Sequence, residues 1–216
     1  DERLSSREVG AWGSGAGGAT AAPSEPHLWA IVAGVSTYAG PALRLRYAAR
    51  DAQSFGAALR IGGTALFGEE RVHVTVLSTE NEAATWPTRA NIEAAFAKAR
   101  AARSGDVLVA YLAGHGAQHR EGDDDDFYFL TQDAVSGALD DPEARRRTTI
   151  SSADMTGWIQ QIPALKQVLV LDTCHAGQLV LDLAASREVP SSHVRAIERM
   201  KDRMGLFILA GAAEPS

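Results

Sequence analysis

The chain has 216 residues, of which 45% are hydrophobic and 22% charged, a composition typical of a globular domain with a full core. No apolar run approaches the roughly 18 residues that a membrane helix needs, so we expect no membrane partner. The net charge of −6 argues against nucleic acid as a partner, because phosphate binding needs clustered lysine and arginine.

The chain contains one cysteine, which excludes an intrachain disulfide and suits a reducing cytoplasm. Residues 1–26 are rich in Gly, Ser, Ala and Pro, lack periodicity, and predict a flexible tether. Within them Gly13, Gly15 and Gly18 match G-x-G-x-x-G, but no strand precedes the glycines, so a tether is preferred to a dinucleotide site. Residues 27–216 form the predicted folded domain.

Five short apolar runs predict strands that are buried on both faces. In chain order they are 28–35, 72–77, 107–112, 168–171 and 206–209. Helical patterns lie between them at 45–59, 88–103 and 153–162. Strands that alternate with helices predict an α/β fold, in which a mainly parallel sheet carries helices on both faces in a three-layer sandwich. In such sheets the ligand site lies outside the carboxyl ends of the strands.

Two groups of reactive residues directly follow predicted strands. One is AGHG, with His115 and Gly116, and the other is DTCHAG, with Asp172, Cys174 and His175. The glycines permit tight turns and let a substrate backbone come close. An imidazole that accepts the proton of a thiol, or stabilises the thiolate, makes the sulfur a nucleophile. The N–H groups of Gly116 and Cys174 are candidates to hold an oxyanion.

Each of these residues also has an ordinary structural interpretation. His115 alone could be a core histidine, and Cys174 alone could be a small buried side chain. Together, in glycine-flanked turns at two strand ends, they favour a catalytic pair. His175 should face away from the cleft, because consecutive residues of an extended segment point to opposite sides. His115 and His119 have the spacing of a helical zinc pair, but Gly116 opposes a helix there, so no metal site is expected.

The two groups resemble the His and Cys signatures of the caspase-like clan, and especially those of metacaspases and their bacterial relatives. Their separation is 174 − 115 = 59 residues, near the spacing of about 50 expected for caspases. Residues 29–38 (WAIVAGVSTY) resemble the first strand of the family, and residues 45–52 (LRYAARDA) resemble the segment that follows it. The resemblance implies a caspase-like fold and a cysteine endopeptidase, with catalytic roles for His115, Cys174 and Gly116 and no cofactor.

The resemblance also implies a substrate preference. Caspases that cut after Asp carry Gln two residues before the nucleophile, whereas this chain has Asp172 there, as metacaspases and paracaspases do. The pockets of those families accept Arg or Lys, and a second pocket acid comes from the segment that matches Asp51. A guanidinium could satisfy both carboxylates with bidentate hydrogen bonds, so cleavage after Arg, and secondarily Lys, is expected. The alternatives are a solvated helix residue for Asp51 and a strand-end cap for Asp172.

Many metacaspases bind calcium through several aspartates, and residues 123–126 form an acidic run. Most such runs are solvated loops. A later acidic cluster of the family falls at 150–154, where Ser151 and Ser152 stand in this chain, so we expect activity without calcium. Related domains have one more core strand than the five predicted here, so the domain is expected to be incomplete at its carboxyl end.

Residues 179–203 match the loop in which relatives are self-processed, and an activating protease or regulatory partner is therefore expected. The arginines of this loop are Arg187, Arg195, Arg199 and Arg203. The expected activity is hydrolysis of protein substrates in the cytoplasm, and the resemblance adds regulated cell death or antiviral defence. A catalytically inactive interaction module is the rival, although it would normally lack the Cys or the His. A flavodoxin-like nucleotide site needs a phosphate-cradling loop, in which Tyr38 would fit poorly.

Overall fold

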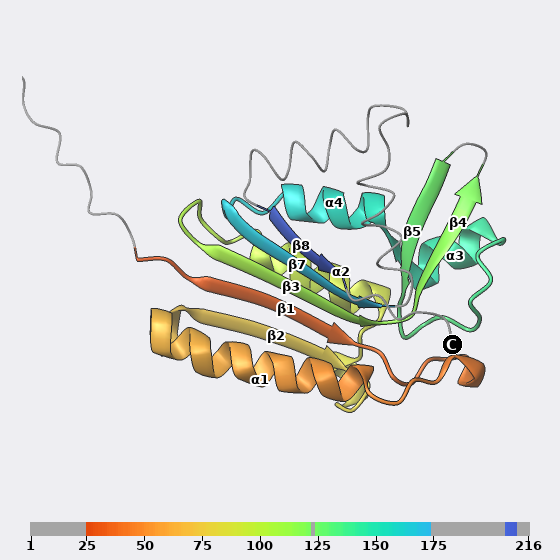
Figure 1. Ribbon diagram of the computed structural model, residues 1–216, viewed down its shortest axis with the longest axis horizontal. Coiled ribbons are helices and arrows are strands. Elements are labelled where there is room, and N and C mark those ends of the chain that lie inside the picture. The colour runs from red at the N-terminus through yellow and green to blue at the C-terminus, as the bar shows by residue number, and fades with distance from the viewer. Residues whose placement is uncertain (1–24, 122–123, 174–205, 211–216) are drawn as a thin grey trace, which may run out of the picture.

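The computed structural model describes residues 25–121, 124–173 and 206–210, and its main sheet has five strands in the order β2-β1-β3-β7-β8 (Figure 1). The neighbours in this sheet all pair in parallel. The strands are β1 (Leu28–Gly34), β2 (Val72–Ser78), β3 (Val107–Gly114), β7 (Lys166–Thr173) and β8 (Leu206–Ala210). Each corresponds to one apolar run of the sequence, so the predicted parallel sheet is confirmed.

Helices cover both faces of the sheet, with α1 below it and α4 above it in Figure 1. The helices are α1 (Ala48–Phe67), α2 (Arg89–Ala99), α3 (Pro142–Thr148) and α4 (Ser152–Gln160). Successive residues of each central strand point to opposite faces of the sheet and pack in two separate hydrophobic cores. Ile31 and Leu112 pack with Phe96 of α2 and Ile159 of α4. Residues of opposite parity, such as Tyr111, pack with α1.

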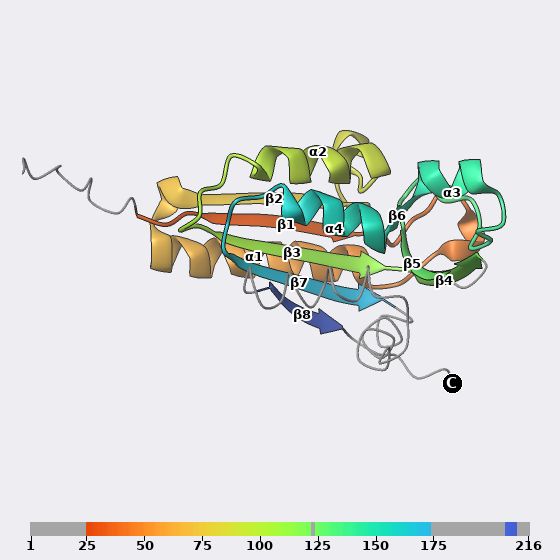
Figure 2. The same cartoon turned by 90° about the horizontal axis from the view of Figure 1, so that it is seen from above.

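A second, antiparallel sheet lies beyond the carboxyl ends of the main strands, together with α3 (Figures 1 and 2). Its strands are β4 (Gly116–Glu121), β5 (Asp124–Leu130) and β6 (Thr149–Ser151), in the order β4-β5-β6. Short 3-10 helices are η1 (Pro41–Leu43), η2 (Glu69–Arg71) and η3 (Ala83–Thr85). The expectation of a loop over residues 123–126 is wrong for its last three residues, because β5 begins at Asp124 and pairs with β4.

Helix α1 begins three residues later than expected and continues to Phe67. Gly63 lies inside this extension, and a Cβ added there would come within 2.7 Å of the Leu28 side chain. The glycine that weakens the helix signal in the sequence therefore lets α1 approach β1 closely. The helix expected at 88–103 is shorter and ends at Ala99. Its start agrees with the expectation, because Thr88 is the N-cap of α2 and accepts a hydrogen bond from the backbone N–H of Asn91. Within the described ranges no helix combines the length and the apolar character needed to cross a membrane.

Candidate active site

His115 follows the last residue of β3 and precedes the first residue of β4, so it stands between the two sheets. The preceding residue, Gly114, has φ +156, and a Cβ there would come within 2.8 Å of the hydroxyl of Tyr38. A side chain at position 114 would therefore be opposed by both the backbone conformation and the close approach of Tyr38. The turn that presents His115 depends on this glycine.

Two residues of the β1–α1 connection hold His115. The buried Tyr38 accepts a hydrogen bond of 2.8 Å from the backbone N–H of His115, and its ring centroid lies 5.3 Å from that of the imidazole. The Nε2 atom of His115 lies 2.9 Å from the carbonyl oxygen of Leu43, at the end of η1. Because a carbonyl oxygen can only accept, this contact assigns the ring proton to Nε2 and leaves Nδ1 as the basic nitrogen.

Cys174 and His175 lie outside the described residues, but the sheet fixes the strand that leads to them. The parallel register of β3 and β7 pairs Ala113 with Asp172 and Gly114 with Thr173. The residues that immediately precede His115 and Cys174 are therefore neighbours across two hydrogen-bonded strands. Strands β3 and β7, which lead to the predicted base and the predicted nucleophile, therefore end side by side at the same edge of the sheet.

Asp172 is exposed near the end of β7, and its Oδ2 atom accepts a hydrogen bond of 3.0 Å from the hydroxyl of Tyr111. It belongs to the face of β7 that carries Val170, two residues earlier, which packs toward α1. Burial raises the pKa of the Tyr111 phenol well above its usual range, and the charges of Asp172 and then Asp51 raise this pKa further.

Asp51 lies in the first turn of α1 and is exposed. It stands one helical turn before Phe55, whose ring stacks on Tyr111 with centroids 4.4 Å apart. Residues spaced i, i+4 share one face of a helix, so Asp51 belongs to the face of α1 that meets Tyr111. The structure thus brings Asp51 and Asp172, 121 positions apart (172 − 51), close enough for both charges to act on one phenol.

Sequence reasoning missed Tyr111, Leu43 and the true role of Tyr38. From the sequence Tyr38 is only an obstacle to phosphate binding, whereas in the structure its hydroxyl accepts a hydrogen bond from the backbone N–H of His115. In the sequence Tyr111 is one residue of an apolar run that predicts a buried strand. Only its hydroxyl group indicates that it could also form a polar contact. Leu43 acts through its backbone carbonyl, which no residue pattern reveals.

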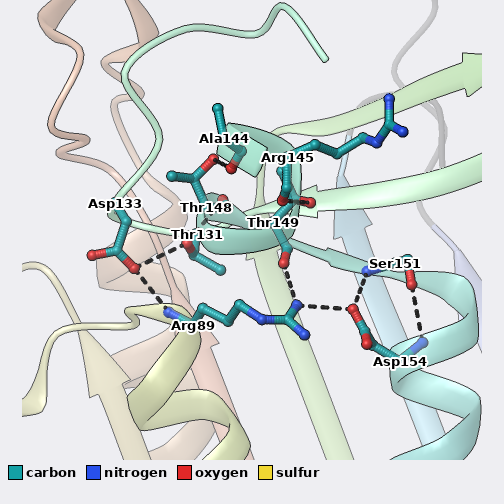
Figure 3. Close-up of polar contacts among 9 residues, drawn as sticks. All are labelled: Arg89, Thr131, Asp133, Ala144, Arg145, Thr148, Thr149, Ser151 and Asp154. Atoms are coloured by element: carbon teal, nitrogen blue, oxygen red, sulfur yellow. Dashed lines mark hydrogen bonds and ion pairs between the residues drawn. The ribbon is translucent and has the colours of Figure 1, made fainter. Parts of the chain in front are cut away.

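Arg89 is the centre of a polar network that joins α2 to residues of three other segments (Figure 3). The Arg89 guanidinium forms an ion pair of 2.8 Å with Asp154 and donates to the carbonyl oxygen of Thr149. The Arg89 backbone N–H donates to Asp133 at 3.0 Å. The neighbouring Gln132 and Ala134 carbonyls then accept hydrogen bonds from the backbone N–H groups of Ala39 and Gly40. The network therefore links α2, α4 and the second sheet to the connection behind His115.

The described residues do not offer a calcium site at 150–154. The Asp154 carboxylate is paired with Arg89 and accepts a hydrogen bond from the backbone N–H of Ser151, while the Ser151 hydroxyl accepts from the backbone N–H of Asp154. The two residues form the capping box of α4, so their oxygens are engaged in structure. No group of three or more His, Cys, Asp or Glu side chains in the described part of the chain could hold a metal ion.

Two other features of the predicted site lie outside the described residues. The loop at 179–203 with its arginines is one, and the position of Asp123 is the other. His119 lies in β4, opposite Asp126 in the register with β5. The chain is extended at this point, so the helical spacing of His115 and His119 does not apply, and the expectation of no helix there is confirmed.

Comparisons with known proteins identify the family of this chain. Residues 29–184 match the family model described as metacaspase, peptidase C14 domain. Metacaspase-4 of Arabidopsis thaliana is 31% identical over 118 residues, which cover 53% of this chain and 26% of the relative. Metacaspase-7 of the same plant is 32% identical over 118 residues, covering 53% of this chain and 27% of the relative. The matches thus span about a quarter of these curated relatives.

A solved structure supports the fold. Protein GSU0716 from Geobacter sulfurreducens superposes with a TM-score of 0.50 and 20% sequence identity, covering 82% of this chain and 64% of that chain. At this identity the likeness concerns the fold alone. The family model spans well over half of the chain and includes both the His and the Cys groups. The chain belongs to the metacaspase family, as a peptidase C14 domain.

Proposed function

We propose that this domain is a cysteine endopeptidase that cleaves protein substrates after Arg, and secondarily after Lys, through a dyad of His115 and Cys174. The observation that carries the proposal is the register of β3 with β7, which pairs Gly114 with Thr173. The two residues that follow this pair are the imidazole and the only thiol of the chain. Family membership supplies the reaction class.

The hydrogen bond from His115 Nε2 to the Leu43 carbonyl supports different roles for the two ring nitrogens of His115. Nδ1 takes the thiol proton of Cys174, and the thiolate attacks the carbonyl carbon of the scissile peptide. The same proton then goes to the leaving amine as the tetrahedral intermediate collapses to a thioester. Water, deprotonated by Nδ1, hydrolyses the thioester and regenerates the thiol. Leu43 keeps the imidazole in the tautomer that this sequence of steps requires.

The N–H of Gly116 is the proposed oxyanion donor. The carbonyl oxygen of His115 accepts a hydrogen bond from the backbone N–H of Leu130, so His115 and Leu130 are a hydrogen-bonded pair of the antiparallel ladder. Hydrogen-bonded and non-hydrogen-bonded pairs alternate along antiparallel strands, which makes Gly116 and Phe129 a non-hydrogen-bonded pair. The N–H of Gly116 is therefore directed away from β5 and can serve an oxyanion.

Asp172 and Asp51 are the proposed acids of the substrate pocket. Both are exposed, and neither forms an ion pair with a described residue. Two carboxylates that both act on Tyr111, neither of them paired with a basic side chain in the described part of the chain, favour a cationic side chain from the substrate. Loss of one carboxylate, as in Asp172→Ala or Asp51→Ala, should weaken binding by about 2–5 kcal/mol.

The test compares hydrolysis of Arg-ending and Asp-ending peptides by the full-length protein and its variants. Cys174→Ala and His115→Ala should abolish turnover while the circular dichroism spectrum stays native. His119→Ala is the matched control, because His119 lies in β4 and has no assigned role. Equal turnover by Cys174→Ala and the parent, or a preference for Asp, would refute the proposal.

We also propose that the protein acts in the cytoplasm, where its single thiol can remain reduced. Regulated cell death or antiviral defence is the proposed setting, and it is supported only by the family resemblance. Deleting the gene, and restoring it as the Cys174→Ala variant, would test this role through survival of infected cells. Equal survival with the variant and the parent would exclude a role for the peptidase activity there.

A further inference from the structure

Tyr111 is a tyrosine in the interior of a buried parallel strand, where an aliphatic residue would be usual. Its side chain is 6% exposed, and its hydroxyl meets Asp172 at the rim of the sheet. The residue has no place in the chemistry described above. A buried tyrosine hydroxyl normally finds a hydrogen-bond partner, and here the partner is an exposed carboxylate of the proposed substrate pocket.

We propose that Tyr111 is a positioning residue that orients the Asp172 carboxylate toward a guanidinium and thereby sets the preference for Arg over Lys. The hydroxyl donates to Oδ2 at 3.0 Å. This hydrogen bond restricts rotation of the Asp172 carboxylate and leaves Oδ1 for the substrate. This inference rests on the proposed function, and it adds a residue that determines specificity.

The position of the phenol is itself fixed. The Tyr111 ring stacks on Phe55 with an interplanar angle of 19° and packs in the cluster that joins α1 to the sheet. The parallel pairing of β3 with β7 places Tyr111 opposite Val170, which lies two residues before Asp172 on the same face of β7. The ring is therefore held where its hydroxyl donates to the Asp172 carboxylate.

A neutral donor suits a binding pocket better than a cation would. A lysine or arginine beside Asp172 would neutralise the carboxylate and compete with the substrate, whereas a phenol leaves its charge intact. Among the described residues, no basic side chain is paired with Asp172. Burial and the two nearby carboxylates raise the pKa of Tyr111, so the phenol keeps its proton and remains a donor throughout the neutral pH range.

Arginine depends on carboxylate orientation more than lysine does. A guanidinium is a planar fork that forms two parallel hydrogen bonds only to a carboxylate held in the matching plane. An ammonium is a compact charge that tolerates rotation of its partner. Fixing Asp172 should therefore favour Arg-ending substrates and should matter little for Lys-ending ones.

The experiment measures kcat/KM of the full-length protein on two peptides that differ only in Arg or Lys at the cleaved position. Tyr111→Phe keeps the ring stacked on Phe55 and removes the hydroxyl. We expect it to lower kcat/KM for the Arg peptide about tenfold, mainly through KM, with a much smaller loss for the Lys peptide. Tyr128→Phe, in β5, is the matched control and should keep the Arg-to-Lys ratio of the parent.

A double-mutant cycle tests whether Tyr111 acts through Asp172. In an Asp172→Asn background, Tyr111→Phe should change the Arg-to-Lys ratio no further. Phe55→Leu provides a second test that retains the phenol, and it should also lower the ratio because the ring loses its stacking partner. The second test stands even where Tyr111→Phe is poorly folded, since Phe55→Leu reports on the same orientation with the phenol retained.

The outcomes separate this inference from the proposed function. A parent protein that prefers Arg, with an unchanged ratio in Tyr111→Phe and Phe55→Leu, overturns the role of Tyr111 alone. Equal losses on both peptides also overturn it, because a merely structural role would have that result. A parent that cleaves after neither Arg nor Lys overturns the proposed specificity and, with it, this inference.

Discussion

The phenolic oxygen of Tyr38 lies 2.8 Å from the backbone nitrogen of His115 and accepts its hydrogen bond. Tyr38 is 4% exposed, and the segment that carries it is tied to the loop after β5 through the N–H groups of Ala39 and Gly40. The histidine is therefore positioned from the β1–α1 connection, far away in sequence. This relationship is the basis of the first two predictions.

Replacing Tyr38 by Phe should impair catalysis and stability together. The change leaves the His115 N–H without its acceptor in a partly buried site, which should cost about 1–2 kcal/mol of unfolding free energy. A less restrained imidazole should lower kcat more than it raises KM. Urea unfolding and steady-state kinetics measure both effects, with the exposed Tyr47→Phe as the control. A variant with the parent's kcat would show that this hydrogen bond does not position the base.

Gly114→Ala should destabilise the turn before His115. The Cβ would approach the Tyr38 hydroxyl to 2.8 Å at φ +156, which an L-residue adopts at a cost of about 1–3 kcal/mol. Thermal unfolding should therefore show a lower midpoint, accompanied by loss of turnover. Gly105→Ala is the control, because a Cβ there meets nothing within 4 Å. Equal melting temperatures for the two variants would contradict the strain assigned to position 114.

The Arg89–Asp154 pair should make the domain sensitive to acid. Burial alone would raise the pKa of Asp154, but hydrogen bonds from Arg89 and Ser151 outweigh it and hold this pKa below its ordinary value of 3.8. Asp154 therefore binds a proton more tightly in the unfolded chain than in the folded one. The stability that the Asp154 carboxylate contributes is present above its unfolded pKa and is lost as the pH falls through its lower, folded pKa.

Chemical denaturation at a series of pH values checks this prediction. The unfolding free energy of the parent should fall on acidification below about pH 4, and Asp154→Asn should show a shallower fall. The exposed Asp140→Asn serves as the control and should follow the parent. Parallel curves for Asp154→Asn and the parent would mean that this carboxylate does not contribute to the acid transition.

Peptidase activity should not require calcium. A calcium site needs about 6–8 oxygen ligands, usually with several carboxylates, and Asp154 is already paired with Arg89. Treatment with a chelator should therefore leave turnover unchanged. Activity that disappears with the chelator and returns with added calcium would assign a metal role to the acidic run at 123–126.

Cleavage within residues 179–203 should control the full-length protein. This segment follows the nucleophile, and Pro190 with the serines at 191 and 192 predicts an exposed turn open to proteolysis. Joint replacement by Gln should prevent fragment formation and lower turnover; the positions are Arg187, Arg195, Arg199 and Arg203. Gel analysis and kinetics on the same samples provide the measurement. An uncut variant as active as the parent would place regulation elsewhere.

The sequence predicts the parallel sheet well, because strands buried on both faces are continuous apolar runs with little ambiguity. It does not predict β4, β5 and β6, whose residues are mostly polar or acidic and become strands only by pairing with one another. The position of His115 after a strand follows from the sequence. Its partners do not, because Leu43 contributes a backbone atom and Tyr38 is brought in by tertiary packing.

The pairing of Gly114 with Thr173 also has a consequence for biosynthesis. Strands β3 and β7 are separated in the chain by the whole second sheet and two helices, so their contact has a large sequence separation. Non-local parallel pairing is slow to form, because the loop-closure entropy is lost before the contacts are gained. The proposed dyad is therefore assembled late, after the ribosome has released most of the domain. Until β3 and β7 pair, the thiol and its proposed base are held apart, so a half-folded chain should lack peptidase activity.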